Sequence, residues 1–509
     1  MIQTQRGTGV RPAVQTNCCV HAEAYIKNDS ISSSGDEMPT APSSICCSID
    51  ETEHIHERHR MIQRLLTVAM SLVLTIAAPE ALAAIDVQTK TLANGMTILV
   101  QEDASIPNIA FYTFYRVGSR NEHEGITGLS HFFEHMMFNG AKKYGKGEFD
   151  SAMDDAGGSN NASTSNDFTV YTDWAPASAL ELMFDLEADR IQNLAFDPAI
   201  IESERQVVYS ERRLSVDNNN GGLLNELLEA TAYESSPYHW PVVGWPSDIE
   251  SWTINDLKEY HAMAYSPTNA TVVVVGNIKA ADVFRLADQY FAPIPAHAPP
   301  PPIRTKEMLQ AGERRVTVHK FAQLPLLDIA YHAVEKNSHD ADAFDMLGTL
   351  LSGGQSSRLY RNLVDTQMAL SVRAGYSDSL LPGLFEISAQ PRAGIAPEKV
   401  EAAIYAELEK LQTTPVDEHE LQKAKNQQIA AYYRGIQSIE RRASAIGYAQ
   451  EFYGDWHEVN KTVDRINAIT AADIQRVAKQ YLVANQRTVA TLIPDATSAA
   501  GNTEKRDGR

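Results

Sequence analysis

Cysteine is almost absent from this chain of 509 residues, and its four cysteines, Cys18, Cys19, Cys46 and Cys47, all lie near the start. Two adjacent pairs without a second motif do not indicate a metal or redox site. The chain after Cys47 contains no thiol, so it folds without disulfides and is compatible with an oxidising compartment.

Positive charge and long apolar runs are also scarce. The chain has 44 Lys and Arg against 65 Asp and Glu, a formal net charge of −21. This balance excludes the basic surface that a nucleic-acid partner requires. The apolar run at residues 65–78 is shorter than the about 20 residues that span a bilayer.

That short apolar run is typical of a secretory signal peptide. Arginines precede it, and Pro79 and an Ala-rich stretch, residues 81–84, follow it. We therefore expect a signal peptide at residues 61–84, with an uncleaved membrane anchor as the alternative. Signal peptides begin near the initiator, and Met61 lies directly before this one, so we expect residues 1–60 to be untranslated. If they are translated, we expect them to be disordered, because they are polar and Ser-rich. An exported, thiol-free chain without a stable membrane span after signal cleavage indicates a periplasmic location.

A proline-rich stretch, residues 292–303, divides the remaining chain into two segments of similar length. We predict domains at residues 85–291 and 304–494 and a disordered tail at residues 495–509. Each segment ends in a Thr followed three places later by Asp, a helix and a β-branched strand, at residues 248–276 and 464–494. This echo favours two α/β domains related by duplication.

The periodicity within each segment predicts strands and helices in alternation. In the first segment it indicates a hairpin around Asn94-Gly95, strands at residues 109–117 and 168–174, and helices at residues 127–137 and 177–192. In the second it indicates strands at residues 326–333 and 384–390, a helix at residues 341–352, and mainly helices over residues 396–449. We therefore expect an α+β fold in which helices pack on mixed sheets.

The stretch HFFEHMMFNG, residues 131–140, carries the clearest chemistry. Residues four apart lie on one face of a helix, so His131 and His135 can reach one metal ion. Glu134 lies at the edge of that face, where a carboxylate can take a proton from water. The order H-x-x-E-H is the reverse of the commoner zinc-hydrolase motif.

A catalytic zinc usually has three protein ligands. Glu204 and Glu211, on a helix predicted over residues 203–214, are two turns apart and share one face, so either could complete the set. The alternative is a buried helix whose two histidines are satisfied by neighbours. Isolated histidines such as His123, His239 and His261 are interpreted as surface or packing residues.

Together these motifs resemble the pitrilysin/insulinase family of zinc metallopeptidases, in particular the small two-domain bacterial type related to mitochondrial processing peptidase subunits. The resemblance implies that one Zn²⁺ is bound by His131, His135 and Glu211. It implies that Glu134 is the catalytic base and that Glu204 supports the site. It also implies that residues 157–176 contain an edge strand on which Asn161, Ala162 and Thr164 bind substrate, and that residues 238–249 are a family loop. The fold implied is two homologous domains, each a mixed, mainly antiparallel sheet with helices packed on it, pairing into a clamshell chamber.

The second segment departs from the family in one respect. An Arg and a Tyr seven residues apart grip the substrate in the family, whereas Leu363 and Leu370 stand at these places here. We therefore predict a periplasmic zinc endopeptidase for peptides or unfolded segments that needs a homologous subunit to supply this pair, a heterodimer rather than a homodimer. The alternatives are a non-catalytic scaffold of the same family and a metal- or peptide-binding protein without turnover.

Overall fold

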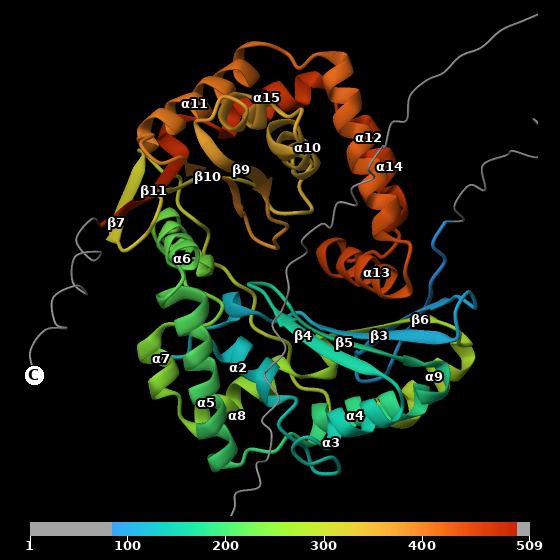
Figure 1. Ribbon diagram of the computed structural model, residues 1–509. Helices are drawn as coiled ribbons and strands as arrows, with labels where there is room; N and C mark the ends of the chain where they lie inside the picture. Colours follow the sequence, from blue (N-terminus) through green and yellow to red (C-terminus); the bar gives the residue numbers. More distant parts are fainter. Residues whose placement is uncertain (1–83, 496–509) are drawn as a thin grey trace, which may run out of the picture. The chain divides into compact units, whose positions relative to one another are not determined.

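The computed structural model describes residues 84–495. The predicted leader, signal peptide and tail lie outside the described residues, apart from Ala84 and Asp495. All described residues belong to one contiguous unit of the chain, Ala83–Arg509. Within it are two β-sheets with helices packed on them, which confirms the predicted α+β fold (Figure 1).

The first sheet has six strands in the order β1-β2-β6-β3-β5-β4. All neighbours are antiparallel except β2 and β6. Its strands are β1 (Gln88–Thr91), β2 (Thr97–Glu102), β3 (Asn108–Tyr115), β4 (Ser159–Thr164), β5 (Thr169–Pro176) and β6 (Ala270–Gly276). The helices of this half are α2 (Leu129–Met136), α3 (Glu148–Asp155), α4 (Leu180–Asn193), α5 (Pro198–Arg212), α6 (Asn220–Ala232), α7 (Pro246–Ser251), α8 (Ile254–Ala264) and α9 (Ala280–Tyr290).

The second sheet has five strands in the order β7-β11-β8-β10-β9, with β7 and β11 parallel. Its strands are β7 (Arg314–Lys320), β8 (Leu326–His332), β9 (Ala369–Tyr376), β10 (Leu384–Pro391) and β11 (Arg487–Pro494). The helices of this half are α10 (Ala341–Ser352), α11 (Pro397–Thr413), α12 (Glu418–Gly435), α13 (Ile439–Tyr453), α14 (Glu458–Ala468) and α15 (Ala471–Tyr481).

The two sheets share one strand order. Leaving out β1, the first reads β2-β6-β3-β5-β4 and the second β7-β11-β8-β10-β9, each with its parallel pair at the same end. The two similar sequences also fold alike. Thr253 caps α8 and Thr470 caps α15, and each helix is followed by a 3₁₀ turn and then by a strand of the parallel pair, β6 or β11. This correspondence supports duplication.

Most predicted elements of the first half are present. The hairpin around Asn94-Gly95 joins β1 to β2, and Gly95 has a φ of 95°, a conformation that glycine adopts freely. Sequence periodicity did not reveal β7 and β9. Leu370 lies on strand β9, which begins just after a turn at Gln367 (φ 64°).

Each face of the first sheet is covered by a different part of the chain. On one face Phe111, Val272 and Val274 pack with helices of the same half. On the other face Phe114 and Val273 pack against side chains of α13, which belongs to the second half in sequence. Alternate residues of a strand point to opposite faces, so these strands are apolar on both sides and read as continuous hydrophobic runs.

The second sheet receives a helix from the first half in return. Leu224 and Leu228 of α6 pack with Ala330, Ala490 and other buried residues of the second sheet. Figure 1 shows α6 beside β7 and β11, and α13 beside the strands of the first sheet. Thus the two halves exchange one helix each.

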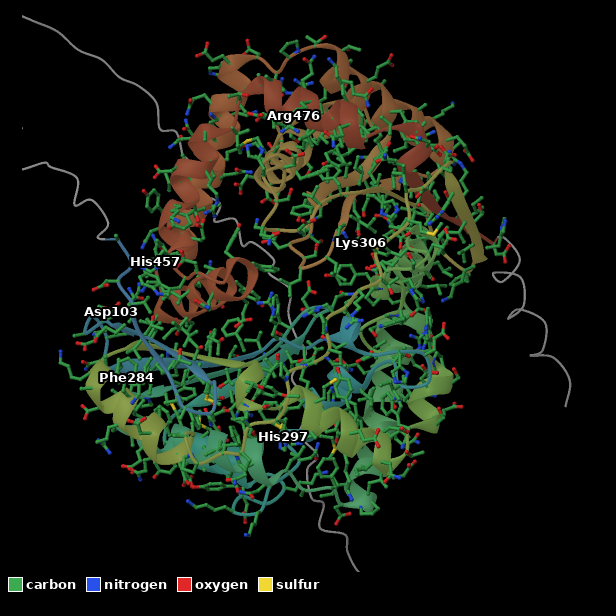
Figure 2. The ribbon with its side chains drawn as sticks, turned by 180° about the vertical axis from the view of Figure 1, so that it is seen from behind. Asp103, Phe284, His297, Lys306, His457 and Arg476 are labelled. Carbon is green, nitrogen blue, oxygen red and sulfur yellow. The ribbon has the colours of Figure 1, made fainter. Side chains whose placement is uncertain are left out.

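Polar contacts accompany this exchange. Arg442 of α13 forms an ion pair with Asp103, which follows β2 and is labelled in Figure 2. Buried Asp167 accepts a hydrogen bond from Tyr238 (2.7 Å) and one from the backbone N–H of Leu380 (2.9 Å) in the second half. Between the halves, residues 295–311 form no helix or strand. Among the described residues, no helix is long and apolar enough to cross a membrane.

Gly447 tests the helix exchange. A Cβ atom there would lie 2.2 Å from the ring of Phe114, so Gly447→Ala forces α13 away from the sheet. We expect a loss of about 1–3 kcal/mol in the free energy of unfolding, measured by urea denaturation. Gly435→Ala in α12 is the control, because a Cβ there meets nothing within 4 Å. Equal stability of the two variants would contradict the close contact. Combining Phe114→Leu with Gly447→Ala should restore part of the lost stability.

Candidate metal centre

Helix α2 presents His131, Glu134 and His135 on one side because its other side is buried. Phe132, Phe133 and Met136 belong to the core of the first half. The helix starts after Gly128, whose φ is 89° and whose Cβ, if present, would lie 2.5 Å from the carbonyl oxygen of Val243. Only glycine fits at position 128, directly before the helix, because any side chain would collide with the backbone of Val243.

A carboxylate holds the start of this helix. The N–H groups of Gly128 and Ser130 donate to Glu122, with distances of 2.7 and 2.6 Å. These amides would otherwise be unpaired, since the first N–H groups of a helix have no partner within it. The motif gave no sign of this contact, because Glu122 lies outside the helix in an irregular segment.

Helix α5 supplies the two glutamates. Asp197 caps it by accepting from the N–H groups of Ala199 and Ile200, and Pro198 occupies its first turn. The helix packs against α2. Glu204 is buried, whereas 47% of the Glu211 side chain is exposed.

Three atoms from these two helices converge. The Nε2 atoms of His131 and His135 are 3.3 Å apart, and Oε2 of Glu211 lies 3.6 Å from the first and 3.3 Å from the second. In a tetrahedral site with metal–ligand distances of about 2.0–2.1 Å, the ligand atoms are about 3.3 Å apart. Their chemistry and spacing fit a zinc ion. The structure thus brings together the three residues predicted to bind the metal.

Glu204 takes a different position from Glu211. Its Oε1 accepts a hydrogen bond from Nδ1 of His135 at 2.9 Å, on the side of the ring opposite to the cluster. This contact fixes the ring orientation and leaves Nε2 for a metal. It separates the roles of two glutamates that helical spacing alone could not distinguish.

The carboxylates also set the charges of the cluster. Burial alone would lower the pKa of His135, but its hydrogen bonds with Glu204 and Glu211 raise that pKa to about 9. Burial, together with the nearby His135, lowers the pKa of His131 to about 4. The hydrogen bond with His135 holds the pKa of Glu211 below its usual value. Without a metal ion the carboxylates thus favour the protonated form of His135, and a bound metal cation would take the place of that proton.

Glu134 lies next to the cluster and is held by a neighbouring strand. The hydroxyl of Thr164, the last residue of β4, donates to Oε2 of Glu134 at 2.6 Å. Burial raises the pKa of Glu134 above its usual value. A carboxylate with a raised pKa accepts protons near neutral pH more readily than an ordinary glutamate.

Strand β4 is one of the two outer strands of the first sheet. Its exposure alternates: Asn161 is exposed, whereas Ala162 packs partly against the core. The side chain of Asn161 accepts from the N–H of Ala162 at 2.9 Å. This bond would have to open before the same N–H could pair with a peptide laid along the strand.

The other predicted residues lie elsewhere. Leu363 is fully buried in the core of the second half, and Leu370 is 42% exposed on β9. Neither side chain has a hydrogen-bond donor. His261 packs among Phe133, Phe196 and Tyr265, as expected for a packing residue.

Family models match both halves of the chain. Residues 98–244 match the insulinase family, peptidase family M16, and residues 251–428 match the peptidase M16 inactive domain. The metal-binding candidates, the glutamates and β4 all fall within the first match.

Relatives extend this similarity over nearly the whole described chain. The zinc protease PqqE of Helicobacter pylori is 31% identical over 86% of this chain and 100% of its own length. A protein described as "Probable mitochondrial-processing peptidase subunit beta" from Arabidopsis thaliana is 24% identical over 79% of this chain and 77% of its own.

Solved structures agree. A crystal structure of a protease from Helicobacter pylori has a TM-score of 0.78 and 31% identity, covering 80% of this chain and 100% of that one. The structure of a peptidase M16 inactive domain from Pseudomonas fluorescens, 18% identical with a TM-score of 0.74, covers 81% of this chain and 98% of its own and shares the fold. The fold, the matches to both halves and the identity to PqqE place this chain in the M16 (insulinase) family of peptidases.

Proposed function

We propose that this protein is a zinc-dependent endopeptidase that hydrolyses peptides or unfolded polypeptide segments. The observation that carries this proposal is that three ligand atoms converge next to a partly buried carboxylate, Glu134, which contacts an outer strand of the first sheet. Relatives named zinc proteases support the choice of metal.

In the proposed reaction His131, His135 and Glu211 hold the zinc ion. The ion supplies Lewis acidity, which makes water a nucleophile near neutral pH. Glu134 removes a proton from the attacking water and then delivers it to the amide nitrogen of the leaving peptide. The Thr164 hydroxyl orients the Glu134 carboxylate, and Glu204 orients His135.

The proposed substrate binds as an added strand along β4. Main-chain groups at the edge of a sheet pair with any extended peptide, so such binding tolerates many sequences. Asn161 and Ala162 lie on the strand that ends at Thr164, and Thr164 contacts Glu134. A peptide paired with β4 therefore passes close to the base.

The proposed location is the periplasm, and the proposed partner is a homologous subunit that forms a heterodimer. The predicted signal peptide at residues 61–84 and the absence of cysteine after Cys47 support export. Leu363 and Leu370 support the partner, because leucine cannot donate a hydrogen bond to a substrate carbonyl. In the proposed heterodimer, the homologous subunit would supply the Arg and Tyr that grip the substrate.

Zinc binding tests the assignment of the ligands. We expect about one zinc ion per purified chain, and we expect Glu211→Gln to lose it, measured by elemental analysis after dialysis. Glu204→Gln should weaken zinc binding by about 10–100-fold in competition with a chelator, because a neutral amide oxygen accepts the His135 hydrogen bond more weakly than the carboxylate does. The control is Glu202→Gln, an exposed residue of α5 whose side chain accepts hydrogen bonds from Arg205 and Gln206 of the same helix. If Glu202→Gln weakened binding as much as Glu204→Gln, the assignment would be wrong.

Glu134→Gln tests the catalytic base. The variant keeps the volume of the side chain and an oxygen for the Thr164 hydroxyl, so it should fold and bind zinc normally. We expect kcat/KM for a quenched fluorescent peptide to fall by about 10²–10⁴-fold. The zinc-loaded protein should be assayed with its partner present. Unchanged cleavage by the variant would favour a scaffold or a binding protein without turnover.

The need for a partner can be tested with the same peptide. We expect low activity from the zinc-loaded chain alone and a marked rise on addition of periplasmic extract from its native host. Affinity capture should then recover a homologous chain that carries an Arg and a Tyr at the positions of Leu363 and Leu370. Full activity from the purified chain as a homodimer would refute the heterodimer and leave the peptidase.

A further inference from the structure

Glu211 is held less directly than the two histidines. It lies in the last turn of α5, almost half exposed, and the ion-pair partners of its side chain are the two histidines themselves. His135, by contrast, is oriented by Glu204. The position of the Glu211 carboxylate therefore depends on the backbone where α5 ends and a π-helical turn, residues 213–217, begins.

Arg212 fixes that backbone. This buried side chain donates two hydrogen bonds to Glu226 of α6, at 2.8 and 2.9 Å, and a third to the carbonyl oxygen of Gly244 at 2.9 Å. Two parallel bonds between a guanidinium and a carboxylate restrict both partners in angle as well as distance. The residue next to Glu211 is thus clamped to α6.

The same clamp reaches the start of the histidine helix. Gly244, which accepts from Arg212, lies against Gly128: a Cβ on Gly244 would be 2.7 Å from the Cα of Gly128. On the other side, a Cβ on Gly222 of α6 would be 1.9 Å from the carbonyl oxygen of Ser215 in the π turn. Helix α6 therefore lies directly against the π turn, and it cannot move toward that turn without displacing it.

Helix α6 is in turn part of the second half's core. Leu224 and Leu228 are buried with residues of the second sheet. Arg314 of β7 donates to the carbonyl oxygen of Ala232 at the end of α6 (2.6 Å), and Asn220 at its start donates to that of Phe321 (3.1 Å). The second half therefore holds both ends of the helix that clamps Arg212 (Figure 1).

We propose that the second half positions the metal ligand Glu211 through α6 and the Arg212–Glu226 pair, so that zinc affinity is coupled to the packing of α6 on the second sheet. The proposal rests on the metal site proposed above and makes Arg212 and Glu226 positioning residues. Coupling of this kind is reciprocal: a helix that strengthens zinc binding is itself stabilised by zinc.

Glu226→Gln removes the charge of the clamp without touching a ligand. We expect zinc affinity, measured by chelator competition, to fall by about 10–100-fold, as when other groups that orient metal ligands are lost. The visible absorption spectrum of the Co²⁺-loaded variant should also change, since it reports the geometry of the ligands. The matched control is Glu401→Gln, which removes a similar, partly buried Arg–Glu pair with Arg315 in the second half. Its zinc affinity should stay within twofold of wild type.

Hydrogen exchange of the unmodified protein gives the reciprocal measurement and does not depend on a variant folding. Zinc should slow exchange throughout α6, although no residue of α6 belongs to the metal cluster. Protection confined to α2 and α5, or unchanged affinity in Glu226→Gln, would overturn the coupling while leaving the metal site. Wild-type protein that takes up no zinc would overturn the metal site and the coupling with it.

Discussion

The burial of one side of α2 is the constraint on which the rest of the site depends. Phe132, Phe133 and Met136 lie in the core, so the remaining side of this short helix must face outward with its two histidines and Glu134. A hydrophobic helix face placed under a sheet is a strong and non-directional anchor. Directional contacts then refine it: Glu122 at the start of the helix, and Glu204 beneath His135.

The two sheets share one strand order but differ in the side chains that their outer strands present. In the first, the outer strand β4 ends at Thr164, which contacts Glu134. In the second, the corresponding outer strand β9 carries an exposed leucine, and no metal cluster is found beside it among residues 84–495. The first half thus contains the candidate metal site, whereas the second half covers the first sheet with α13 and packs against α6.

Much of this could be predicted from the sequence because it depends on local spacing. The four-residue spacing of His131 and His135, the Asn-Gly turn and the Thr–Asp caps are each decided within one or two turns of chain. Glu204 and Glu211 could not be separated by helical spacing, because both lie on one face of α5; the family resemblance distinguished them, and their contacts with opposite sides of the His135 ring agree with it. The strands β7 and β9 were missed since they are edge strands with few buried residues. The Arg212–Glu226 clamp was invisible because the motif does not specify how the chain turns after Glu211.

The exchange of α6 and α13 has a consequence for how the protein forms. The face of the first sheet that contains Phe114 and Val273 is covered by a helix that ends at Tyr453, far along the chain. During synthesis from the N-terminus, that face stays uncovered until almost the whole chain has emerged. Contacts between residues so distant in sequence form late and slow the search for the native state. The first half, although synthesised first, therefore completes its core only after α13 has been made. Until then its uncovered apolar strands must be protected from aggregation with other chains.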